Sequence, residues 1–232
     1  MNIRNNAERS TASLLIDVYL KYEKIIIPVF LVVSLSSGFY YLDWHNNLLF
    51  NEGVKFFELN TFMDRAIPFS PAWVWVYVLY YPFCFMPLFL LKNIDTFRRV
   101  AGAFLAEFVL AFIVFLALPV KMLRPDVVPN SLSTTVVAAI YRFDPGFNVF
   151  PSMHVANSLL VALIFYKYDR RLGVPFMAIA VLISLSTMFV KQHYALDVFT
   201  GALDSLIVFP LFFKGHVTFK AEETVMTTWH HR

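Results

Sequence analysis

Six apolar runs constrain this chain more than any other feature of its sequence. A helix needs about 17–25 apolar residues to cross the hydrocarbon core of a bilayer, and only the fourth run is short by this count. The runs lie at about 25–42, 71–91, 100–119, 152–166, 173–190 and 194–213. Because backbone polar groups must be paired inside a bilayer, such runs form helices. The sequence predicts an all-α, polytopic membrane protein with a bundle of six transmembrane helices.

The composition supports a membrane protein and excludes other classes. Of the 232 residues, 59% are hydrophobic, above the roughly 45–50% of a soluble globular domain. The net charge of +3 is too small to indicate a nucleic-acid partner. Cys84 is the only cysteine, so no intramolecular disulfide forms.

The sequence predicts three parts. An amphipathic N-terminal segment at 1–24 lies on the cytoplasmic membrane surface, a six-span membrane domain fills 25–213, and a cytoplasmic tail occupies 214–232. With six spans, most of the 19 Lys and Arg residues fall on the same side as both termini. Positively charged loops stay in the cytoplasm, so both termini are expected there. The opposite face is then periplasmic, exterior or lumenal.

Two polar residues meet on that opposite face, where the fifth and sixth runs join. His193 and Asp197 are four residues apart in KQHYALD, which places them on one side of a helix. The carboxylate can accept a hydrogen bond from one ring nitrogen and leave the other as a base or nucleophile. The alternative is a polar pair that only caps the sixth helix.

A second motif, Pro151-Ser152-Met153-His154, has the features of a helix start on the same face. Proline suits a first turn, and serine caps free N–H groups. Such an N-terminus binds anions, and His154 beside it could donate a proton to a leaving oxygen. The alternative is an ordinary cap with a surface histidine.

Three cations accompany these residues. Arg124 offers a planar fork suited to phosphate, and Lys121 and Lys191 add point charges. Each alone is also compatible with a charge that faces lipid headgroups. Two histidines and an aspartate can form a metal ligand set, but the neighbouring cations would repel a metal ion and attract an oxyanion. We expect no metal and no cofactor.

The order of these motifs resembles the type-2 phosphatidic acid phosphatase superfamily. The motifs are Arg124-Pro125, then Pro151-Ser152-Met153-His154, then His193 with Asp197. The resemblance covers about residues 60–213, and the site of that family is similar to the site of vanadium haloperoxidases. It implies a metal-independent lipid phosphatase that forms a phosphohistidine. His193 would be the nucleophile with Asp197 to orient it, His154 the general acid, and Arg124 and Ser152 would bind the phosphoryl oxygens, with Lys191 and Lys121 nearby.

Two departures from the commonest phosphatase pattern leave an alternative open. Ala117 stands where that pattern has a lysine, and Ser186-Thr187 stands where it has Ser-Arg. Lys191 is a candidate to substitute for the missing arginine. Similar losses occur in the branch that resembles inositol phosphorylceramide and sphingomyelin synthases, which transfer a headgroup. The segment DRAIPFSP at 64–71 is also similar to that branch.

The sequence predicts a lipid substrate without naming it. A phospholipid, an isoprenoid phosphate or a sphingolipid phosphate would each present phosphate at the expected depth, and neither the oligomeric state nor the membrane follows from the sequence. Glu107 and Asp204 lie within predicted spans, where ionisable groups are costly and often functional. Their roles stay open.

Overall fold

The computed structural model describes residues 11–214, and within that stretch the chain is all-α. Isolated bridges join Phe57 to Val120 and Val120 to Asn148, but these described residues form no strand. The helices are α1 (Thr11–Asn51), α2 (Phe62–Ala66), η1 (Pro71–Trp73), α3 (Val74–Val78), α4 (Tyr80–Cys84), α5 (Met86–Leu90), α6 (Ile94–Ala117), α7 (Leu132–Phe143), α8 (Met153–Tyr168), α9 (Arg170–Phe189) and α10 (Ala195–Phe213). The predicted fold class is confirmed.

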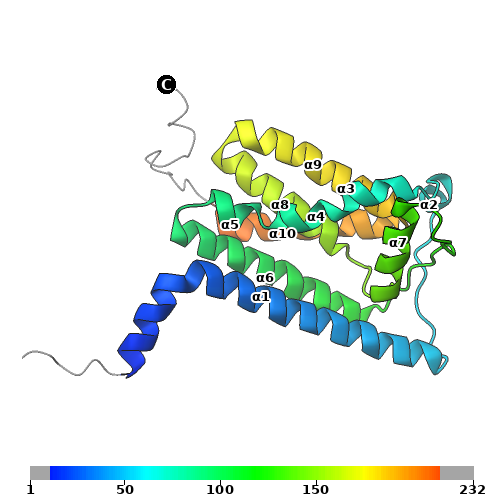
Figure 1. Cartoon of the computed structure of the whole chain (residues 1–232), viewed down its shortest axis with the longest axis horizontal. Helices are drawn as coiled ribbons and strands as arrows, with labels where there is room; N and C mark the ends of the chain where they lie inside the picture. Colours follow the sequence, from blue (N-terminus) through cyan, green and yellow to red (C-terminus); the bar gives the residue numbers. More distant parts are fainter. Residues whose placement is uncertain (1–10, 215–232) are drawn as a thin grey trace, which may run out of the picture.

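The long helices lie side by side along the long axis of the molecule (Figure 1). The helix α8 packs against α6, α9 and α10, and α1 packs along α6. The short helix α7 crosses one end of this bundle (Figure 1), where it contacts η1 and α3. We call this the α7 end, and the end that holds the α8–α9 turn the far end.

Four helices are long and apolar enough to cross a membrane: residues 20–51 of α1, together with α6, α9 and α10. The six-span count is not confirmed. The helix α8 has only 16 residues, and the segment at 71–91, predicted as one helix, consists instead of the short helices η1, α3, α4 and α5. Pro82 and Pro87 lie in this segment, and proline lacks the N–H that a continuous helix needs.

The first helix extends beyond its predicted span. It runs without a break through residue 24, where the sequence predicts a domain boundary, and Pro28 lies inside it. Figure 1 shows α1 bent towards its N-terminal end, as expected where proline removes a hydrogen bond. Residues 1–10 and the predicted tail from 215 onward lie outside the described residues. The three-part division therefore stays a prediction.

The apolar core holds α8 in place from several sides. Leu160 and Ile164 of α8 are fully buried and cluster with Ile183 of α9 and Val208 of α10. Burying a large aliphatic side chain contributes about 1.5–3 kcal/mol. The core lies along the C-terminal half of α8, so its N-terminal half is free to carry polar residues.

Candidate active site

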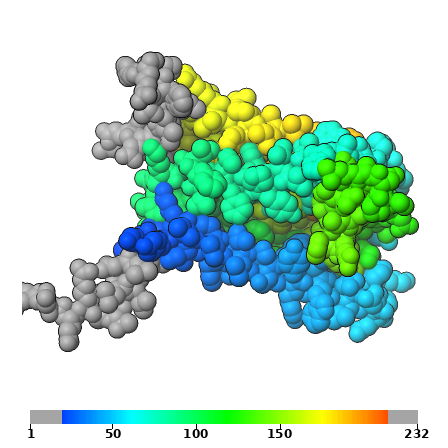
Figure 2. All heavy atoms as spheres, in the orientation of Figure 1, coloured from blue at the N-terminus to red at the C-terminus, as the bar shows by residue number. Residues whose placement is uncertain are grey.

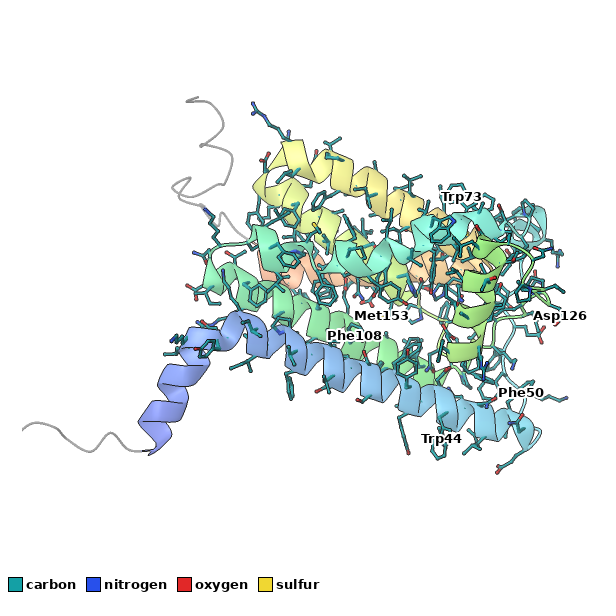
Figure 3. All side chains as sticks on the ribbon, in the orientation of Figure 1. Trp44, Phe50, Trp73, Phe108, Asp126 and Met153 are labelled. Carbon is teal, nitrogen blue, oxygen red and sulfur yellow. The ribbon has the colours of Figure 1, made fainter. Side chains whose placement is uncertain are left out.

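The N-terminus of α8 contacts the first turns of α10 through backbone atoms. Ser152 caps α8 by accepting a hydrogen bond from Val155 N, and its own N–H donates to the Asp197 carbonyl at 3.0 Å. A Cβ added at Gly201 would lie 2.3 Å from the Ser152 carbonyl oxygen. Only glycine permits this approach. Figure 3 shows Met153, the first residue of α8, within the bundle and not at its outer edge.

The structure brings the two predicted histidines together although they are 39 residues apart. His154 Nδ1 lies 3.3 Å from His193 Nε2. The other nitrogen of His193, Nδ1, lies 2.9 Å from the Val149 carbonyl oxygen and 3.4 Å from Asp197 Oδ2. A carbonyl oxygen only accepts hydrogen bonds, so Nδ1 carries the proton and Nε2 presents its lone pair towards His154.

The Val149 carbonyl is an orienting group that sequence reasoning missed. Asp197 Oδ2 accepts a 2.8 Å hydrogen bond from Tyr194 N at the start of α10, so this carboxylate also caps a helix. Both uses considered for Asp197 are therefore compatible with its position. No residue type signals the Val149 contact, because every residue has a backbone carbonyl.

His193 is buried, and burial sets its protonation state. Burial lowers the pKa of His193 to about 4, although the Asp144 carboxylate and the hydrogen bond to Val149 oppose this shift. The positive charge of Arg124 lowers the pKa further. The ring is therefore neutral at pH 7, which a nitrogen nucleophile requires.

Arg124 lies beside this histidine in a buried polar group. Its guanidinium donates to the Asp144 backbone oxygen and to Gln192 Oε1, and its Nε is buried without a hydrogen-bond partner. The guanidinium also lies 4.7 Å from the Tyr141 ring centre. Sequence reasoning missed Asp144 and Gln192, although Gln192 directly precedes His193.

Tyr194 holds the loop that carries Arg124. Its hydroxyl accepts a hydrogen bond from Leu123 N at 3.0 Å and donates to the Lys121 carbonyl at 3.2 Å. Since Tyr194 follows His193 directly, one residue fixes Arg124 relative to the histidine pair.

The two predicted lysines are directed to other partners. Lys191 Nζ donates to the backbone oxygens of Asp64 and Ile67 at 3.0 and 2.6 Å. Lys121 Nζ lies 3.7 and 4.1 Å from the ring centres of Phe50 and Phe147. Burial lowers the pKa of both ammonium groups, and Arg124 also lowers the pKa of Lys121. The structure does not bring either ammonium group into hydrogen-bond contact with His154 or His193.

The DRAIPFSP segment lies against the loop that carries His193. Asp64 Oδ1 accepts a 2.7 Å hydrogen bond from Ala195 N, and Ser70 N donates to the Phe189 carbonyl at 2.9 Å. Together with the Lys191 contacts, these bonds link residues 64–70 to both ends of the turn between α9 and α10. Sequence reasoning singled out this segment but gave it no position.

Aromatic side chains pack around His154. Its ring centre lies 4.7 Å from that of Tyr77 and 4.3 Å from that of Tyr80. The Tyr80 hydroxyl accepts a 2.7 Å hydrogen bond from Asn157 Nδ2. Sequence reasoning missed both Tyr80 and Asn157, since neither carries a motif.

Comparison with known proteins now adds the family. The sequence model of the PAP2 superfamily matches residues 99–220. This chain belongs to the PAP2 superfamily. The PAP2 match includes Arg124, Ser152, His154, His193 and Asp197, so the predicted relationship to the type-2 phosphatidic acid phosphatase superfamily is confirmed. It does not separate the phosphatase branch from the headgroup-synthase branch.

One similar curated protein is the Uncharacterized protein MJ0662 of Methanocaldococcus jannaschii. It is 41% identical over 59 residues, which are 25% of this chain and 24% of that protein. The PAP2 chain thus spans about a quarter of the length of this relative. No solved structure matches this chain.

Proposed function

We propose that this protein dephosphorylates a membrane lipid phosphate or diphosphate without a metal, through a phosphohistidine intermediate at the non-cytoplasmic membrane face. The observation that carries this proposal is the 3.3 Å contact between His154 Nδ1 and His193 Nε2. It pairs a neutral nucleophile with a proton donor, which is the requirement of a two-step displacement.

In the first step, the contact between the two rings opens and the phosphoryl group enters between them. The Nε2 lone pair of His193 forms a bond to phosphorus as the bond from phosphorus to the lipid oxygen breaks. His154, protonated in the substrate complex where the phosphate charge favours the charged ring, gives a proton to that leaving oxygen. The Val149 carbonyl, 2.9 Å from Nδ1, stabilises the positive charge that develops on the His193 ring.

In the second step, His154 takes a proton from water, and the resulting hydroxide attacks phosphorus. The nitrogen–phosphorus bond breaks, phosphate leaves, and both histidines return to their starting state. Each step is a phosphoryl transfer, in which positioning and charge stabilisation account for most of the rate.

The phosphoryl oxygens would be held by Arg124 and by the N-terminus of α8. The buried Nε of Arg124 has no hydrogen-bond partner, and N–H groups in the first turn of a helix have no partner inside the helix. Ser152, fully buried at the cap, adds a hydroxyl. Arg124 must share its other nitrogens with Asp144 and Gln192, which keeps the fork fixed before substrate binds.

The membrane topology is part of the same proposal. Four long apolar helices and the PAP2 match are consistent with an integral membrane protein. The segment of η1 and α3–α5 and the 16-residue α8 would complete six spans, with both termini in the cytoplasm. The α7 end, with the histidine pair, would then face the periplasm, exterior or lumen.

The test is product analysis with phosphorus-labelled lipids in EDTA, using phospholipid, isoprenoid and sphingolipid phosphates. The purified protein is expected to release free phosphate, and His193→Ala is expected to lose on the order of 10³-fold or more of this activity. Wild type stopped during turnover should carry an acid-labile label that is stable to alkali, as a phosphohistidine is.

The control is His45→Ala, because His45 stacks on Tyr41 in α1. This variant should keep wild-type activity. Full activity in His193→Ala would refute the mechanism. Label that moves into a new lipid or soluble ester, with no free phosphate, would replace hydrolysis by headgroup transfer.

A further inference from the structure

An apolar cavity of about 250 Å³ lies between α1, the α4–α5 segment and α6. Figure 2 shows this face of the molecule, with α1 along one side and the α3–α5 segment along the other. Its lining includes Leu35, Tyr80, Cys84, Phe104, Phe108 and Asn157. Sites for drug-sized ligands measure about 300–1,000 Å³, so this cavity suits one hydrocarbon chain and not two.

The cavity lies next to the candidate active site, with Tyr80 between them. Tyr80 lines the cavity, and its ring centre lies 4.3 Å from that of His154. Asn157 also lines the cavity and lies three residues after His154, on the same side of α8. A lipid whose phosphate sits at the histidine pair would therefore place its first carbon atoms beside Tyr80 and Asn157.

Asn157 has an unused hydrogen-bond acceptor at this point. Its side chain is 2% exposed, and its Nδ2 donates to the Tyr80 hydroxyl at 2.7 Å. Its Oδ1 is buried without a hydrogen-bond partner. A buried acceptor without a partner is costly in a lining that is mostly apolar, and the bond to Tyr80 uses only the amide nitrogen. A ligand that brings a donor would satisfy it.

We infer that Asn157 determines substrate specificity by accepting a hydrogen bond from a donor next to the phosphoester bond. The preferred substrate is then a single-chain lipid phosphate. The carbon next to its phosphoester carbon carries a free hydroxyl or an amide N–H. A diacyl lipid has only ester oxygens there, and these cannot donate. This inference rests on the proposed function.

The test compares two lipids that differ only in this donor. The first is 1-acyl-glycerol-3-phosphate with a free 2-hydroxyl, and the second has the same acyl chain and a 2-methoxy group. Wild type is expected to prefer the hydroxy lipid in kcat/KM by about tenfold. Asn157→Leu, which has a similar shape and no acceptor, should bring this ratio close to one by losing rate on the hydroxy lipid.

The matched control is Leu35→Ala, on the α1 side of the cavity. It should change kcat/KM for both lipids by the same factor and keep the ratio. Should Asn157→Leu not fold, Asn157→Ala removes the same acceptor and takes its place.

The other outcomes separate the two proposals. A wild-type ratio near one, a ratio kept in the Asn157 variant, or turnover of diacyl lipids alone would overturn the role of Asn157 and leave the phosphatase proposal standing. Release of phosphate from no lipid at all would overturn both.

Discussion

The two ends of α8 contact a neighbouring helix in the same way, through a glycine, and differ in what the contact positions. At the far end, a Cβ added to Gly173 of α9 would lie 2.1 Å from Tyr166 Cα. At the α7 end, a Cβ added to Gly201 of α10 would lie 2.3 Å from the Ser152 carbonyl oxygen. In both places backbone meets backbone, so no flexible side chain can move aside.

The surroundings of the two contacts explain why the likeness ends there. Gly173 follows the turn after Asp169, which caps α9, and this turn joins α8 and α9 beside the apolar core. Gly201 instead joins segments far apart in the sequence, and its partner Ser152 caps the helix that carries His154. The far-end contact therefore brings two helices together, whereas the other contact also sets the position of a proposed catalytic group.

One methyl group added at each glycine tests most directly whether the two contacts differ in what they position. Gly201→Ala must shift α10 or the start of α8, and a displacement of about 1 Å can cost about 10²-fold in rate. We expect that loss in kcat per folded molecule, measured as phosphate release from the same lipid. Gly173→Ala should keep kcat, because the shift falls at the other end of the bundle.

Both alanine variants should lose stability to a similar degree. Overpacking typically costs about 1–3 kcal/mol, which thermal unfolding in detergent would detect. Equal losses of kcat in the two variants would contradict the distinction between the ends, since it would mean that general loosening of the bundle controls the rate.

The next largest effect is expected in the pH dependence of kcat/KM, which His193 at the α7 end determines. The proposed nucleophile must be neutral, and burial lowers the pKa of His193 to about 4. The acid limb of kcat/KM should therefore lie near pH 4, not near the ordinary histidine value of about 6.5. The charged groups that act on this ring are Asp144 and Arg124, and His154 faces it.

The same pKa gives a stability trend of definite sign. Between about pH 6.5 and pH 4 the unfolded chain binds more protons at this histidine than the folded chain does, so stability falls as the pH is lowered through this window. His193→Asn should show a shallower fall in thermal unfolding, and Gly173→Ala should keep the wild-type slope. An acid limb near 6.5 would mean that the nucleophile is solvated in the working enzyme.

Sequence reasoning predicted the α7 end better than it predicted the spans. The fixed spacing of His193 and Asp197 and the proline and serine before His154 gave local signals, and the structure brings both motifs together. The single helix predicted at 71–91 is divided into short helices, because hydrophobicity over a window does not register what Pro82 and Pro87 do to a helix.

What remained hidden depends on contacts between distant segments. The Val149 carbonyl, the bond between Asn157 and Tyr80, and the approach of Gly201 to Ser152 join residues that no spacing rule connects. Backbone groups and single glycines carry no motif, so a sequence without a structure cannot reveal them. Lys191 shows the converse case. Its charge beside His193 predicted a phosphate ligand, but its ammonium group contacts backbone oxygens instead.

The smallest effect is expected at Lys191, which was predicted to bind phosphate and which the structure shows bound to backbone oxygens. Its ammonium donates to the backbone oxygens of Asp64 and Ile67. Lys191→Met should remove two of the hydrogen bonds that hold α2 against the turn between α9 and α10 while leaving Arg124 and the histidine pair in place. We expect a loss of about 1 kcal/mol in stability and a fall in kcat/KM of about threefold. Lys55→Met, which removes an exposed lysine, should change neither.

If Lys191 instead binds phosphate in the transition state, kcat would fall by about 10²-fold or more, as when one oxyanion donor is removed. The size of this one loss therefore decides whether the cation beside His193 acts on the substrate or on the fold.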